Sequence, residues 1–125
     1  MLILFLVTLL NKIIINQQKI VQESIDILLA QNCFNIQSIE LSQDPFSDFL
    51  LLATARSQTQ LSASIYKLKD YYKSNEISSK SEGESTSWAL IAAEDILINI
   101  LTEEARLFYS LEDLYFDCKI TTIHT

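Results

Sequence analysis

The sequence predicts a single-domain α/β sandwich with a mixed β-sheet of about five strands. Three observations lead to this fold class: an unbroken apolar run at 49–55, a helical repeat of apolar residues over 61–72, and two β-rich runs separated only by Glu94 and Asp95. The chain has 125 residues, of which 49% are hydrophobic, so it can bury one core but not two. Helices that alternate with strands in this way are typical of a layered α/β domain.

Residues 1–10 are almost wholly apolar, and three isoleucines follow Asn11 and Lys12. The uninterrupted run is about half of the roughly 20 residues that a membrane-spanning helix needs. It also lacks the basic start and the cleavage site of a signal peptide. Three interpretations of residues 1–16 remain: an extra helix or strand packed on the domain, a weak membrane anchor, or sequence upstream of the true start codon. We favour the first and the third, and therefore expect no membrane partner.

The domain proper is expected to begin at Gln17. Residues 17–31 have helical spacing, with apolar side chains at Ile20, Val21, Ile25, Leu28 and Leu29. Residues 33–41 have strand content, and residues 42–47 contain Asp44 and Pro45, which indicate a turn. The run Phe49–Ala55 has the uniform apolar character of a strand buried on both faces of a sheet.

Ser57 and Gln60 form a capping-box pattern at the start of the next helix. Its apolar residues recur with helical spacing at Leu61, Ile65, Leu68 and Tyr72. A polar linker over residues 74–87 contains the only glycine, Gly83, and a short edge strand is expected around Ile77.

The last part of the domain is predicted to be a β-hairpin followed by one short helix. The hairpin strands are Trp88 to Ala93 and Ile96 to Leu101, and the helix runs from Glu103 to Tyr115 with carboxylates at its positive end. The domain thus covers residues 17–117, and residues 118–125 form a short polar tail.

Charge is distributed unevenly along the chain. The net charge of −7 arises entirely after residue 81, where nine acids face only Arg106 and Lys119. An acidic surface repels phosphate backbones, which argues against nucleic acid as the main contact, and it attracts basic proteins. The simpler interpretation is a solvated acidic face.

The residues needed for common catalytic chemistry are not grouped in this sequence. Cys33 and Cys118 match no zinc spacing, and the one histidine, His124, lies near the end of the polar tail, so no metal and no cofactor are expected. One glycine cannot make a phosphate-binding loop. Adjacent carboxylates such as Glu94 and Asp95 point to different sides and do not converge on a substrate.

Three segments, in order and at characteristic spacing, carry a resemblance to a known family. The first is an Asp before an apolar strand that ends in Ala-Thr, followed by the start of a helix: Asp48, Phe49, Leu50 to Leu52, Ala53, Thr54, Ser57 and Gln60. The second is Glu-Gly before a Trp strand: Glu82, Gly83 and Trp88. The third closes the domain: Glu104, Ala105, Arg106, Tyr109, Leu111, Glu112, Leu114 and Tyr115. Over roughly Gln18 to Asp117 the chain resembles the ribosomal silencing factor family, also called the Iojap family.

The chain departs from the family pattern at five positions and at its N-terminus. The residues that stand where the family has others are Ala55, Ala92, Glu94, Asn99 and Tyr115. The resemblance implies a fold similar to a nucleotidyltransferase core, but the Gly-Ser and Asp-x-Asp set of such enzymes is not found here, so no enzymatic activity is implied.

The function that the resemblance implies is repression of translation in the cytoplasm. Members bind a basic protein of the large ribosomal subunit, ribosomal protein number fourteen, and block subunit joining; many are homodimers when free. We expect Trp88 and Leu90 to be apolar anchors of this contact, with Asp95, Asn99 and Glu112 as its polar and charged part. Supporting roles are expected for Glu82, Gly83, Arg106 and Tyr109. The alternatives are a nucleotide-handling enzyme on the same fold and a membrane-tethered adaptor that uses residues 1–16.

Overall fold

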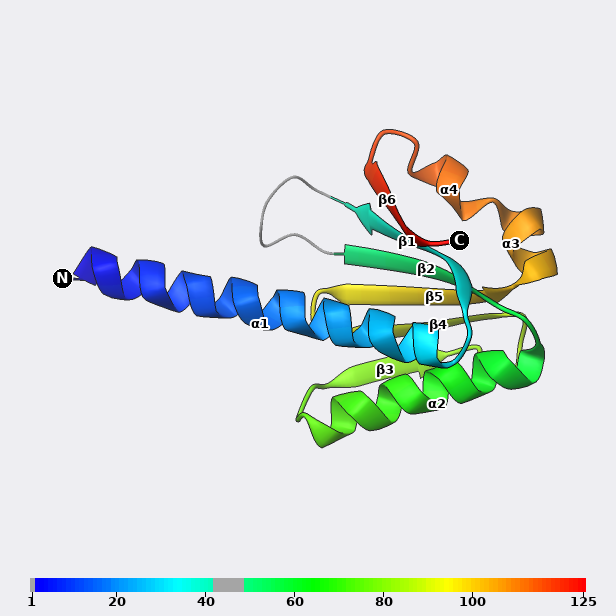
Figure 1. Cartoon of the computed structure of the whole chain (residues 1–125), viewed down its shortest axis with the longest axis horizontal. Coiled ribbons are helices and arrows are strands. Elements are labelled where there is room, and N and C mark those ends of the chain that lie inside the picture. The colour runs from blue at the N-terminus through cyan, green and yellow to red at the C-terminus, as the bar shows by residue number, and fades with distance from the viewer. Residues whose placement is uncertain (1, 42–48) are drawn as a thin grey trace.

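Six strands form one mixed sheet in the computed structural model, which describes residues 2–41 and 49–125 (Figure 1). Their order across the sheet is β3-β4-β5-β2-β1-β6. The strands are β1 (Phe34–Glu40), β2 (Phe49–Ala55), β3 (Ser79–Glu82), β4 (Trp88–Ala93), β5 (Ile96–Thr102) and β6 (Lys119–His124). The central pair β2 and β5 is parallel, and the other four neighbouring pairs are antiparallel. The predicted α/β class with a mixed sheet is therefore confirmed.

The central strand β2 is the apolar run that the sequence predicts. Residues 50–55 are all buried, because β2 has a strand on each side and packed side chains on both of its faces. The β4–β5 hairpin is also confirmed, with a two-residue turn in which Glu94 has a φ of 52°. The glycine that such a turn prefers is thus replaced by a strained glutamate.

Two long helices, α1 (Leu2–Ala30) and α2 (Gln58–Ser74), cover one face of the sheet (Figure 1). The main core lies between them and the strands, and the predicted apolar residues of α2 are all buried. Tyr72 of α2 and Ser24 of α1 are joined by a buried hydrogen bond of 2.7 Å between their hydroxyl oxygens. Since the Ser24 hydroxyl donates to the carbonyl of Ile20, the tyrosine hydroxyl is the donor to Ser24.

The helix α2 begins where the capping pattern predicts. The Ser57 Oγ accepts a hydrogen bond from the Gln60 backbone N–H at 3.1 Å. The Gln60 side chain does not complete the box, because its Oε1 accepts from the N–H of Arg56, one residue before the cap.

The first helix is much longer than the sequence predicts. It begins at Leu2 and continues without a break into the predicted helix that starts at Gln17. Residues 2–12 are all exposed, so the expectation of an extra element packed on the domain is wrong for these residues. An uninterrupted helix is possible because the segment contains neither glycine nor proline.

Two short helices, α3 (Glu103–Tyr109) and α4 (Leu111–Leu114), lie over one end of the opposite face of the sheet (Figure 1). The sequence predicts one helix here, which is wrong. Ser110 adopts a left-handed conformation with a φ of 47°, and its N–H donates to the carbonyl of Arg106. This cap ends α3 and turns the chain into α4.

The sixth strand, β6, lies in the segment predicted to be a polar tail. It pairs antiparallel with β1 at the edge of the sheet, and most of its side chains are exposed, so its sequence carries little apolar signal. The other edge strand, β3, begins two residues after the predicted centre at Ile77. The predicted turn with Asp44 and Pro45 lies outside the described residues.

A buried guanidinium ties α3 and α4 to the sheet. Arg106 of α3 is only 6% exposed, and its Nη1 donates to the Asn35 carbonyl at 2.7 Å and to the Thr54 Oγ1 at 2.8 Å. Its Nη2 donates to the Gln37 Oε1 at 3.0 Å, and its Nε donates to the Glu112 carboxylate of α4. Asn35 lies at an irregularity of β1 and has a φ of 47°, so the arginine also stabilises an unusual stretch of backbone.

We expect the substitution Arg106→Lys to lower the free energy of unfolding by about 3 kcal/mol, because one ammonium cannot replace the four directed donors and leaves buried acceptors unpaired. The matched control is Arg56→Lys, whose guanidinium is exposed and lies 4.4 Å from the centre of the Phe34 ring. Its cost should stay below about 1 kcal/mol. Urea unfolding measures the free energy of unfolding of both variants. Equal decreases for the two would show that the Arg106 hydrogen bonds do not stabilise the fold.

Candidate functional site

The side chain of Trp88 lies half-buried at the start of β4, on the face opposite α1 and α2. Its indole Nε1 donates to the Oδ1 of Asn99 on β5 at 2.8 Å, and Asn99 itself is 4% exposed. The backbone holds the two strands together beside the indole, since the Thr102 N–H donates to the Ser87 carbonyl at 2.9 Å. The orientation of the indole is therefore fixed by a buried polar partner.

Three aromatic rings form a continuous series from this strand to the outside of the molecule. The centroids of the Trp88 and Tyr109 rings lie 4.8 Å apart. The centroids of the Tyr109 and Phe108 rings lie 5.0 Å apart, and these two rings meet edge to face. Tyr109 and Phe108 belong to α3, which Arg106 fixes to the sheet. Offset and edge-to-face contacts of this kind are the favoured aromatic geometries.

The series ends in an exposed apolar patch, which we define as Leu107, Phe108, Leu114 and Phe116. Leu107 and Phe108 are 78% and 81% exposed, and Leu114 and Phe116 are similarly open. Four large apolar side chains this exposed within ten residues make α3, α4 and the turn after them a candidate interaction surface. The sequence predicts one helix from Glu103 to Tyr115 and gives no sign that Leu107, Phe108 and Leu114 are exposed.

A row of side chains extends the site across the sheet. Glu82 of β3 pairs with Leu90 of β4, and Leu90 pairs with Asn99 of β5, so all three point to the same face. Glu82, Gly83, Trp88 and Leu90 line a shallow depression of about 270 Å³. The structure therefore brings together three of the expected contact residues, Trp88, Leu90 and Asn99, with the supporting residues Glu82, Gly83 and Tyr109.

The turn before β4 requires its glycine. Gly83 has a φ of 78°, and a Cβ atom at this position would lie 2.4 Å from the carbonyl oxygen of Trp88. Thr86 closes the turn, since its Oγ1 lies within hydrogen-bond distance of the carbonyls of Gly83 and Trp88. Beside them, a hydrogen bond from Ser81 lowers the pKa of the exposed Glu84 carboxyl. This carboxylate lies 3.9 Å from the ammonium group of Lys69 on α2, which offsets its charge.

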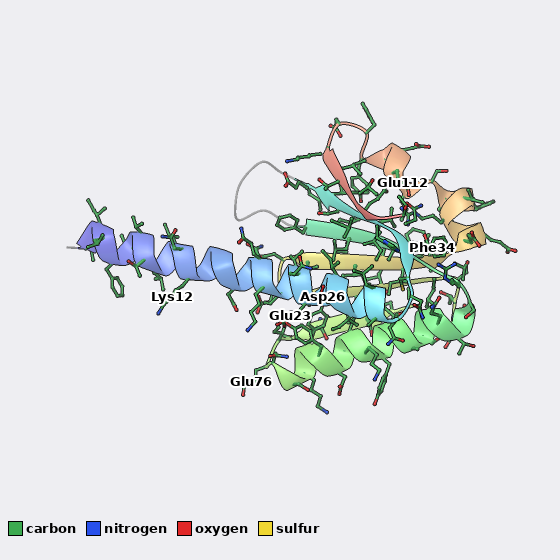
Figure 2. The ribbon with its side chains drawn as sticks, in the orientation of Figure 1. Lys12, Glu23, Asp26, Phe34, Glu76 and Glu112 are labelled. Carbon is green, nitrogen blue, oxygen red and sulfur yellow. The ribbon has the colours of Figure 1, made fainter. Side chains whose placement is uncertain are left out.

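The other two expected contact residues occupy different surroundings. Asp95 lies in the hairpin turn at the opposite end of β4, where its Oδ2 accepts from the Nε2 of Gln17 at 3.2 Å and its backbone carbonyl accepts from Phe49. Glu112 lies on α4 (Figure 2), and its carboxylate is paired with the guanidinium of Arg106. Asp95 is thus separated from the indole by the length of the strand, whereas Glu112 is on the element next to α3.

The elements that carry the aromatic and apolar side chains of the site, and their neighbours, also carry carboxylates. The exposed ones are Glu103 and Glu104 on α3, Asp113 on α4, Asp117, and Glu82 on β3. Arg106 is buried and already paired with Glu112, whereas the exposed Lys80, on the same face of β3 as Glu82, and the exposed Lys119 of β6 offset part of this charge. An apolar centre with an acidic rim has the composition expected of a protein-binding surface.

The described residues offer little for catalysis. Within residues 2–41 and 49–125, no group of three His, Cys, Asp or Glu side chains could hold a metal ion. Burial raises the pKa of the Cys33 thiol, which lies 3.4 Å from the Ser64 hydroxyl in the core, so this cysteine is not a nucleophile at neutral pH. The arrangement is suited to binding a macromolecule.

A family model and a related protein both match this chain. The family model described as "Ribosomal silencing factor during starvation" matches residues 15–125. A protein named ribosomal silencing factor RsfS, from Zymomonas mobilis subsp. mobilis, is 33% identical over 100 residues, which are 78% of this chain and 73% of the relative.

Two crystal structures share the fold. One, from Bacillus halodurans, is 23% identical with a TM-score of 0.68, and the match covers 78% of this chain and 94% of that chain. The other, from Chromobacterium violaceum, is 22% identical with a TM-score of 0.72, and the match covers 86% of this chain and 92% of that chain. At this identity the two structures support the architecture alone.

We expect Gly83→Ala to cost about 2 kcal/mol and to lower the unfolding temperature by about 10 °C, because alanine is strained at this φ and its methyl group meets the Trp88 carbonyl. The emission of Trp88, the only tryptophan, should shift to longer wavelength as the indole loosens. The control Ser85→Ala lies in the same turn and should stay within about 0.5 kcal/mol of the unchanged chain. Identical melting curves for both variants would remove Gly83 as a support of the site.

Proposed function

This chain belongs to the ribosomal silencing factor family, and from that premise we propose that it binds the large ribosomal subunit and sterically blocks subunit joining. The proposed contact is a basic protein of that subunit, ribosomal protein number fourteen. The observation that carries the proposal is the series Trp88–Tyr109–Phe108, which connects a fixed indole to an exposed apolar patch inside an acidic rim.

The apolar part of this surface supplies the affinity in our proposal. Interfaces obtain most of their binding energy from a few aromatic and aliphatic anchors that become fully desolvated. Trp88 and Leu90 are half-exposed in the free protein, and Phe108 is almost fully exposed, so a partner would remove considerable apolar area from water. Their positions are already fixed by Asn99 and Arg106, which lowers the entropic cost of binding.

The charge of the surface supplies the selectivity. Acidic side chains at the rim attract a basic partner and accelerate encounter, and they repel ribosomal RNA that lies close by. We propose that Glu112 contributes through its field while it remains paired with Arg106. Asp95 takes part only if the partner extends along the whole of β4, because it lies in the turn at the far end of this strand.

Blocking needs no chemical step in this mechanism. A rigid domain that occupies the subunit-facing surface of the large subunit excludes the small subunit by volume alone, so we propose binding without catalysis. The site of action is the cytoplasm, where the subunits meet. The exposed apolar patch could also join two copies of the free protein, and in that case dimer dissociation would precede ribosome binding.

We expect Trp88→Ala to weaken co-sedimentation with isolated large subunits by tens of fold, because it removes the central anchor. Circular dichroism should show that the variant remains folded, and Trp88→Phe should retain part of the affinity. Light scattering of mixed subunits should show that the unchanged chain slows their joining and that Trp88→Ala does so much less. Undiminished binding by Trp88→Ala would place the contact elsewhere.

Phe108→Ala tests the exposed apolar patch separately from the fold. We expect about a tenfold loss of affinity for large subunits with no change in unfolding temperature, since this ring is 81% exposed. The matched control is Tyr66→Ala, because Tyr66 is 68% exposed but lies on α2, on the other side of the sheet. Equal affinities for the two variants would contradict the proposed role of the patch.

A further inference from the structure

The N-terminal part of α1 extends beyond the domain as a free helix (Figure 1). Residues 2–10 are apolar except for Thr8, and their apolar side chains are between 42% and 77% exposed. Only 13% of the most apolar 18-residue stretch of α1 is buried within the domain. This part of the helix is therefore not a core element, although its composition is that of one.

The apolar side chains of residues 2–10 surround the helix on every side. Nine consecutive residues make two and a half turns, and this segment has no polar face. Its one polar side chain is satisfied internally, since the Thr8 Oγ1 donates to the Leu4 carbonyl at 3.0 Å. A protein partner would cover one stripe and leave the rest in water, whereas hydrocarbon covers the whole circumference.

We propose that residues 2–10 insert into one leaflet of a lipid bilayer and hold the domain at the membrane surface. A helix of this length is about 14 Å long, close to half of the roughly 30 Å of a hydrocarbon core, so it enters the bilayer without crossing it. From Leu6 onward the backbone N–H groups of this segment are paired within the helix, whereas those of its first turn have no intrahelical acceptor and must keep contact with water or lipid headgroups.

The residues at the base of this segment suit the headgroup region. Asn11 and Lys12 end the apolar run, and Lys12 projects from the helix towards solvent (Figure 2). Lys19 follows seven residues later, which places it on the same side of the helix. The first acid of the chain is Glu23, so the portion next to the lipid carries only positive charge.

Membrane docking and ribosome binding use opposite ends of the molecule. The N-terminus and α3 lie at opposite ends of the long axis in Figure 1. The family match begins at residue 15, so the inserted segment also lies outside the part that this chain shares with its family. A protein held by residues 2–10 would therefore present Trp88 and the exposed apolar patch away from the lipid.

The test is flotation of the full chain with vesicles of phosphatidylcholine and phosphatidylglycerol in a 3:1 ratio. The full chain should float with the lipid, and the double variant Phe5→Glu, Leu9→Glu should lose at least tenfold in vesicle binding, because charges in the hydrocarbon region are strongly disfavoured. The matched control is Tyr66→Glu: Tyr66 is as exposed as Phe5, at 68% against 66%, and this variant should bind vesicles within twofold of the unchanged chain.

Three results would overturn the inference. They are failure of the unchanged chain to float, equal flotation of the double variant, and a lipid-independent dimer in gel filtration that the double variant abolishes while vesicles are not bound. Co-sedimentation of the same double variant with large ribosomal subunits should be unchanged, because neither substituted residue packs on the domain. If the unchanged chain floats and the double variant does not, a loss of large-subunit binding by the double variant would count against the proposed function and not against membrane docking.

Discussion

The hydrogen bonds of Arg106 are the constraint on which the second face of the sheet depends. A buried guanidinium is tolerated only when most of its donors are used, and here four of the five reach the irregular part of β1, the end of β2 and the carboxylate on α4. Through them α3 has a single position over the sheet, and that position places Tyr109 against Trp88. The orientation of the aromatic site is thus decided by a residue that does not reach the surface.

The two faces of the sheet differ in how much of their apolar surface is covered. One face is closed by α1 and α2 around the main core, which includes the buried hydroxyl pair of Ser24 and Tyr72. The other is covered only at one end, where a smaller cluster holds Leu50, Leu52 and Leu101 below α3 and α4. Stability comes mainly from the first face, so the second can leave aromatic and apolar side chains in water for a partner.

Much of this architecture is predictable from local sequence. The run Phe49–Ala55, the cap at Ser57 and the spacing from Leu61 to Tyr72 each indicate the type of an element from its own residues, although the burial of β2 also needs its neighbours β1 and β5. The clustering of Trp88, Leu90 and Asn99 follows in turn from the two-residue hairpin, which fixes their register.

The remaining features depend on contacts between distant parts of the chain. The strand β6 is held by pairing with β1, about 80 residues earlier, and its polar side chains give no apolar pattern. The break at Ser110 depends on a left-handed backbone that serine seldom adopts. The spacing of apolar residues places Leu107 and Phe108 in a helix. It does not tell which side of this helix packs on the sheet, and so it does not predict that both side chains are exposed.

The parallel pairing of β2 with β5 has a consequence for how the chain acquires its fold during synthesis. Residues 49–55 can join residues 96–102 only after the intervening helix and two strands have been synthesised, so closure of the centre is a non-local event. The β4–β5 hairpin is local and can form first, which makes it the natural nucleus to which β2 is added. Because β5 emerges late, more than four fifths of the chain must leave the exit tunnel before the second edge of β2 finds its partner, and until then that edge is open to wrong pairing.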